Sequence, residues 1–121
     1  MILSLLLTVA VTTSPLPASY SDTDEASLSL ENKSLLRCAA AFALVARSQE
    51  AGEESSQKWP ELGERGREFF VRALAQVMDE TGYDREGITR AAGAQAREIQ
   101  QSGDLDKIMP VCLVMLENSG A

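Results

Sequence analysis

Residues 35–46 read LLRCAAAFALVA, and this stretch decides the fold. Its apolar residues recur three and four positions apart, which is the spacing that places side chains on one face of an α-helix. One such face holds Leu35, Cys38, Ala39, Phe42, Val45 and Ala46, and a second face holds Leu36, Ala40, Ala43 and Leu44. We therefore predict a helix over residues 30–49 that packs against neighbours on two sides.

Three later stretches have the same periodicity. They predict helices over residues 61–81, 85–101 and 104–117. No stretch alternates between apolar and polar residues for long enough to indicate a strand. The fold class that we expect is all-α, a small bundle of about four helices formed by one domain, residues 30–121.

Turn and cap residues set the boundaries of these predicted helices. Gly82 and Gly103 are expected to end the second and third helices, since glycine readily adopts the left-handed conformation found after a helix. Asp84 and Asp104 are expected to cap the starts of the third and fourth helices. Pro110 lies inside the fourth, where the loss of one backbone hydrogen bond predicts a kink or a restart.

The first eighteen residues have the composition of a signal peptide. MILSLLLTVAV, residues 1–11, is apolar and uncharged, and small and polar residues with two prolines follow it. This pattern predicts a signal peptide over residues 1–18 with cleavage after Ala18. The alternative is a buried N-terminal helix or strand. Residues 19–29 are rich in serine and acids and predict a disordered leader.

The two cysteines predict a disulfide bond between Cys38 and Cys112. In an exported chain an even number of cysteines indicates pairing, and this bond would join the first predicted helix to the last. The alternative is two buried free thiols that pack as small apolar groups. A redox-active pair is disfavoured, because thiol–disulfide enzymes use close spacing such as CxxC.

Charge and composition argue against nucleic-acid binding and against common enzyme chemistry. The net charge is -7, whereas a nucleic-acid partner requires a positive surface. The chain has no histidine, so it lacks the usual general base near neutral pH and the commonest zinc ligand. We therefore predict that the protein is not an enzyme. We expect no catalytic residues, no metal ligands and no cofactor.

Several local patterns suggest chemistry, and each has a simpler interpretation. Met109, Cys112 and Met115 carry soft sulfur atoms of the kind that bind Cu(I), but core packing explains the same residues. Residues 74–92 resemble a helix-turn-helix, which we interpret as an ordinary helical hairpin. Residues 79–86 lack the ligand order of an EF-hand. The carboxylate pairs Glu53/Glu54 and Asp104/Asp106 are expected to be solvated.

Three segments carry a resemblance to known proteins: RCAAAF at 37–42, GREFFVRALAQVMDETG at 66–82 and MPVCLVML at 109–116. Their layout is similar to small exported helical proteins of unknown function from proteobacteria. More loosely, a small acidic helical chain with Cys38 and Cys112 resembles the periplasmic acid-stress chaperones of the HdeA type. The wide separation of the cysteines departs from that family, so its mechanism is not carried over.

The function that we expect is binding of an unidentified protein partner by a periplasmic or secreted helical domain. After cleavage of the signal peptide no stable membrane anchor is expected. The alternative is a stress chaperone, in which acid loosens the bundle and exposes Phe42, Phe69 and Phe70 to client proteins. A small enzyme is a third and less favoured class.

Overall fold

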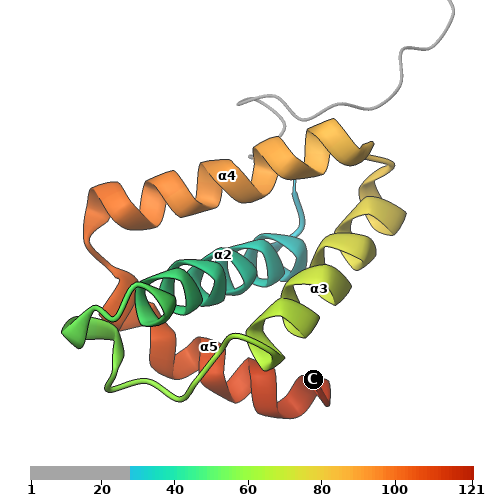
Figure 1. Ribbon diagram of the computed structural model, residues 1–121. Helices are drawn as coiled ribbons and strands as arrows, with labels where there is room; N and C mark the ends of the chain where they lie inside the picture. Colours follow the sequence, from blue (N-terminus) through green and yellow to red (C-terminus); the bar gives the residue numbers. More distant parts are fainter. Residues whose placement is uncertain (1–27) are drawn as a thin grey trace, which may run out of the picture.

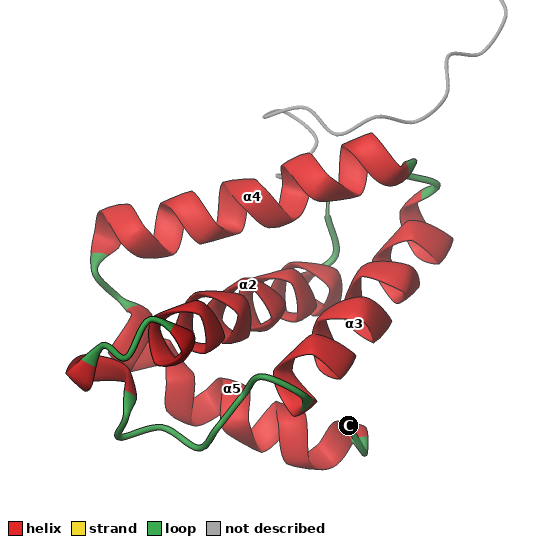
Figure 2. Cartoon of the chain, viewed as in Figure 1, coloured by secondary structure: helices red, strands yellow, loops and turns green. Residues whose placement is uncertain are grey.

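The computed structural model describes residues 28–121, and these residues form helices without any strand. Figures 1 and 2 show the arrangement of the four α-helices, with a short 3₁₀ helix in the first connection. The elements in chain order are α2 (Leu30–Glu50), η1 (Glu54–Ser56), α3 (Arg65–Thr81), α4 (Arg85–Ser102) and α5 (Leu105–Ser119). The predicted all-α class is confirmed.

Helix α2 is the central element of the fold, and the other three helices surround it (Figure 1). Its start is fixed by Ser29, whose Oγ accepts a hydrogen bond from the backbone N–H of Asn32 at 3.0 Å. Along its length Leu36, Phe42 and Val45 are buried, and they belong to different sides of the helix. The prediction that this helix packs on two sides is therefore confirmed.

Helix α3 begins at Arg65, four residues after the predicted start at residue 61. The cause lies in the glycines at this end, because glycine is unfavourable in a helix interior. Gly63 lies outside the helix, and Glu64 occupies the cap position without a side-chain hydrogen bond to the backbone. Gly66 is buried in the first turn, where an added Cβ would lie 3.4 Å from the Cβ of Phe42.

The turns after α3 and α4 follow the sequence pattern. Gly82 and Gly103 have φ values of 76° and 72°, and each ends its helix as predicted. Asp84 caps α4, since its Oδ1 accepts from the N–H of Gly87 at 2.7 Å. The predicted side-chain cap at Asp104 is wrong: its carboxylate makes no cap bond, and its N–H instead donates to Ser102 Oγ at 3.3 Å.

Helix α5 continues through Pro110 and does not restart there. Proline removes the hydrogen bond to the carbonyl four residues earlier and crowds that carbonyl, but a helix survives where packing holds both of its halves. Met109 lies on one side of the proline and Cys112 and Leu116 on the other, and all three are buried. The ring of Pro110 is exposed, so it does not displace a core side chain.

Two apolar clusters stabilise the described domain. The larger one lies around α2, α3 and α5, and includes an edge-to-face contact between Phe42 and Phe69, whose ring centroids are 5.1 Å apart. The smaller one lies where α3 and α4 meet, and contains Val77, Tyr83 and Ile88. This second cluster fills the corner between the two helices, so that the α3–α4 connection is packed onto the start of α2.

The two cysteines lie at disulfide distance, with their Sγ atoms 2.15 Å apart and their Cα atoms 5.2 Å apart. Cys38 comes from α2 and Cys112 from α5, and both side chains are buried. The bond spans 74 positions of sequence, so it joins the first described helix to the last. The predicted pairing is therefore the one that the structure has.

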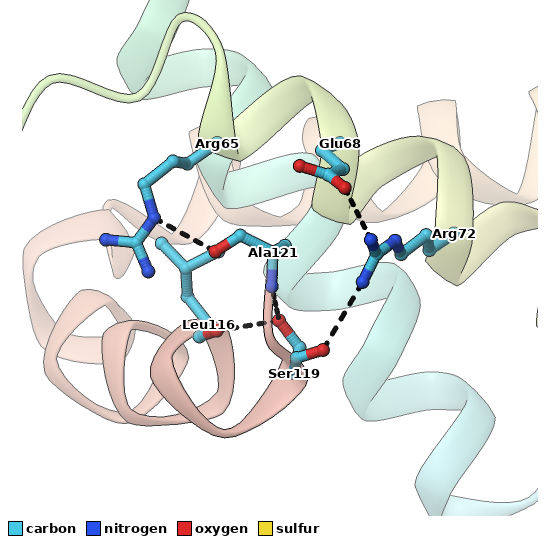
Figure 3. A network of polar contacts seen from close by, with 6 residues as sticks. All are labelled: Arg65, Glu68, Arg72, Leu116, Ser119 and Ala121. Carbon is cyan, nitrogen blue, oxygen red and sulfur yellow. Dashed lines mark hydrogen bonds and ion pairs between the residues drawn. The ribbon is translucent and has the colours of Figure 1, made fainter.

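The far end of α5 is held against α3 by two arginines (Figure 3). Arg65 Nε donates to the carbonyl of Ala121 at 3.0 Å, and Arg72 Nη1 donates to that of Ser119 at 3.4 Å. Within the helix end, Ser119 Oγ donates to the carbonyl of Leu116 at 2.6 Å. Cationic donors suit this position, because the last carbonyls of a helix lack intrahelical partners and carry partial negative charge.

Removal of the disulfide bond tests how much it stabilises the fold. The double variant Cys38→Ala and Cys112→Ala should lower the free energy of unfolding by about 4 kcal/mol, because the oxidised chain has a long closed loop in its unfolded state. Urea denaturation followed by circular dichroism measures this difference. If the variant and the unreduced protein are equally stable, and reductant does not change the stability of the unaltered protein, the disulfide bond is contradicted.

The conformation at Gly103 gives a second prediction. Gly103→Ala should destabilise the protein by about 1 kcal/mol, since a Cβ is unfavourable at positive φ. Gly63→Ala is the matched control, because Gly63 has no positive φ and no atom within 4 Å of an added Cβ. Thermal unfolding of both variants should show a lower midpoint for the first alone, and equal midpoints would argue against the left-handed turn.

Candidate functional site

A groove lies over the second apolar face of α2. Helices α3 and α4 meet at their connection and run apart from there, so they cover this face near the start of α2 and leave it open farther along (Figure 1). Leu36 and Ala40 are accordingly buried, whereas Ala43 is exposed and Leu44 is half-buried. The two sides of the groove are α3 and α4, and α2 is its floor.

The inner part of the groove has a volume of about 340 Å³ and an apolar lining. Phe70 and Leu74 project from α3, and small residues form the floor and the α4 side. The only hydroxyl in the lining, that of Thr89, donates to the backbone carbonyl of Arg85 at 2.8 Å. The remaining lining residues are Ala40, Ala43, Leu44, Ala92, Gly93 and Ala96.

The outer part of the groove is a larger hollow of about 840 Å³ at the end of α2. Ala43 and Phe70 line both parts, so the two hollows lie next to each other along α2 and α3. The wall at this end is the connection between α2 and α3, which contributes Trp59. The groove therefore runs from an apolar inner part to an outer part with mixed polar and apolar walls.

One side chain, Gln49, anchors the connection that forms this wall. Its Nε2 lies within 3.2 Å of the carbonyl oxygens of Ser56, Trp59 and Pro60, and its Oε1 accepts from the N–H of Leu62 at 3.0 Å. A single amide thus satisfies several backbone groups of a connection that has little regular structure of its own. The wall of the groove is consequently fixed to the end of α2.

Three arginines lie in or near the groove, one from each of α2, α3 and α4. Arg47 of α2 and Arg67 of α3 line its outer part. On α4, the Nη1 atom of Arg97 lies 3.4 Å from the position that a Cβ of Gly93 would take. None of the three takes part in the four ion pairs found among residues 28–121. Those pairs are Lys58–Asp106, Arg65–Glu117, Arg72–Glu68 and Arg90–Glu86.

Acidic residues lie beyond these arginines, at the outer end of the groove. Glu50 follows Arg47 by three residues on α2, and Glu64 precedes Arg67 by three residues at the start of α3. Glu61 lines the same end. Going outward, the groove is therefore apolar first, then basic, then acidic.

The residues singled out for metal chemistry do not form a site in the described domain. Cys112 is bonded to Cys38, so it has no free thiolate to offer beside Met109 and Met115. No group of three or more metal-ligating side chains occurs among the described residues. Glu53, Glu54 and Asp106 are exposed.

The helical hairpin at residues 74–92 has mixed charge on its exposed side, where Arg90 pairs with Glu86. Within residues 28–121, no helix is both long enough and apolar enough to cross a membrane. The predicted signal peptide, residues 1–18, and most of the predicted leader lie outside the described residues. Cys38 and Cys112, the residues of the predicted disulfide, contribute to the core and not to the groove.

Sequence reasoning did not identify the groove. The residues that signal it are Ala43 and Leu44 on α2 and Ala92, Gly93 and Ala96 on α4, but their spacing is the same as that of core residues. Nor does the sequence indicate the anchoring by Gln49, because its partners lie seven to thirteen residues away in an irregular segment.

Comparison with known proteins gives no relative: no family model, curated protein or solved structure matches the chain.

Loss of the Gln49 amide should loosen the groove wall. Gln49→Ala should lower the free energy of unfolding by about 2 kcal/mol, because several backbone groups lose their partner. It should also increase quenching of Trp59 fluorescence by acrylamide, and Trp59 is the sole tryptophan. Gln57→Ala is the control, since that amide makes one exposed bond to the Glu53 carbonyl. Equal quenching in both variants would contradict the anchoring.

Proposed function

We propose that this chain is an exported, non-enzymatic binding protein, periplasmic or secreted, that holds an apolar segment of another protein in the groove between α2, α3 and α4. The observation that carries the proposal is the open apolar inner part of the groove, about 340 Å³ in volume. Concave sites with predominantly apolar linings and a few polar groups at the edge are the usual form of binding sites.

Two features support the export part of the proposal. A cysteine pair at bonding distance is compatible with an oxidising compartment, since such bonds persist in the periplasm and outside the cell. The composition of residues 1–18 supports it independently, because a short uncharged apolar run followed by small residues is typical of a cleavable signal.

The non-enzymatic part of the proposal is supported by the composition of the groove. The chain has no histidine, and the hydroxyl of Thr89 is engaged with a backbone carbonyl. The Gln49 amide is engaged with the connection between α2 and α3. The charged groups at the outer end are guanidinium and carboxylate groups, which suit recognition of charged side chains.

The acid-chaperone alternative lacks an observation of its own in the described residues. Phe42 and Phe69 pack against each other in the larger core, and Phe70 is part of the groove. A groove that is open in the folded protein favours binding by the native state, without the loosening that the chaperone hypothesis requires.

Site-specific photocrosslinking in the cell envelope tests the proposal. A photoreactive residue at Ala43, in the groove, should give a discrete crosslinked protein adduct, because this position would contact the partner. The same residue at Val114 should not give it, since Val114 is exposed on α5 and does not line the groove. Denaturing gel electrophoresis and mass spectrometry of the adducts provide the measurement.

The same samples test export through the intact mass of the recovered chain. Loss of the first eighteen residues, with thiols that react only after reduction, is the expected result. Identical adducts at both positions would contradict binding in the groove. A full-length chain with two reactive thiols would contradict export.

A further inference from the structure

We infer that the occupant of the groove is a single amphipathic α-helix of the partner, with a ridge of large apolar side chains and acidic residues one turn beyond that ridge. The inference rests on the proposed function and specifies its partner. Amphipathic helices that insert an apolar face into a groove are a common mode of protein recognition, with anchors at positions i, i+3, i+4 and i+7.

The shape of the groove suits a helix better than an acyl chain. Apart from Leu44 and Thr89, its floor and its α4 side consist of small residues, among them Ala43, Gly93 and Ala96, which allow the backbone of another helix to approach closely. The groove is open along one side, so an acyl chain lying in it would keep much of its surface in water. A helix instead fills the groove with one face and presents its polar face to solvent.

The three arginines indicate the charge of the occupant. Arg47 follows Ala43 by four residues, Arg67 precedes Phe70 by three, and Arg97 follows Gly93 by four. On α2 and α3 an arginine therefore lies one turn beyond an apolar lining residue, whereas the guanidinium of Arg97 reaches back to Gly93. None of the three forms an ion pair within residues 28–121, although the chain has 18 acidic residues against 11 basic ones.

The acidic residues farther out limit where the negative charge of the occupant can lie. Glu50 and Glu64 are each three residues beyond an arginine, toward the outer end. Acidic side chains of a bound helix are attracted at the level of Arg47 and Arg67 and repelled farther out. The matching helix consequently has its acidic residues directly after the apolar ridge.

Three synthetic helical peptides test the inference. They share one ridge of leucines and differ in the residues one turn beyond it, which are Glu, Gln or Lys. Binding is followed through the fluorescence of Trp59, which lies in the groove wall. The Glu peptide should bind about tenfold more tightly than the Gln peptide. Each exposed ion pair contributes little to the binding free energy, but the contributions of the three pairs add up. The Lys peptide should bind most weakly, and salt should reduce the differences.

Charge-reversed variants connect this preference to the groove. The double variant Arg47→Glu and Arg67→Glu should prefer the Lys peptide to the Glu peptide. Arg85→Glu with Lys107→Glu is the matched control, because it changes the net charge equally at two exposed cations that do not line the groove. The control should keep the preference of the unaltered protein.

A groove-filling variant checks the location. Gly93→Leu should abolish binding of the Glu, Gln and Lys peptides alike while circular dichroism shows an intact helical fold, since the added side chain fills part of the inner groove as well as contacting the Arg97 guanidinium. Unchanged binding by Gly93→Leu would overturn the inference. So would the absence of binding by any peptide, and crosslinking at Ala43 would then decide separately whether a protein partner exists.

Two further outcomes separate this inference from the proposed function. Equal affinity for the Glu, Gln and Lys peptides, all lost in Gly93→Leu, would overturn the acidic character of the occupant and leave the proposed function standing. Saturable binding of palmitate with no binding of any peptide would overturn both, since the groove would then hold a lipid.

Discussion

The described structure depends on how closely the other helices can approach α2. Ala39 and Ala41 have no exposed surface, and the alanine-rich centre of α2 allows neighbours to pack against it from several sides. Gly66 does the same from α3: an added Cβ would lie 3.2 Å from the Cβ of Leu62 and 3.4 Å from that of Phe42. Close packing of this kind maximises dispersion contacts per residue, which a small domain with a modest core requires.

Much of this fold could be predicted from the sequence, because periodicity and capping are local properties. Phe42 and Val45 mark the inward side of α2 by spacing alone, and Gly82 and Gly103 mark helix ends through backbone conformation. The late start of α3 was missed because proline and acidic residues at 60–64 are equally compatible with a first helical turn. Gly63, which is unfavourable in a helix interior, lies outside the helix, so the local signals at this end conflicted with one another.

The groove could not be predicted for a related reason. An apolar face indicates that a helix packs against something, but it does not indicate over what length the neighbour covers it. Leu36 and Leu44 lie on the same face of α2, yet one is fully buried and the other is half-exposed. The difference follows the angle at which α3 and α4 run apart from their junction, where Leu36 packs with Tyr83 and Ile88 (Figure 1). Such an angle is a property of the assembled fold.

The junction of α3 and α4 also makes the two ends of the groove different. Where α3 and α4 meet, Val77, Tyr83 and Ile88 pack with Leu36 of α2, so the groove is closed at this end. A closed end acts as a stop for anything that lies lengthwise in the groove. The tip of a chain can reach that stop, whereas the middle of a long chain would have to bend away before it. For the protein partner that we propose, this corner would favour a segment that ends there over one that continues past it.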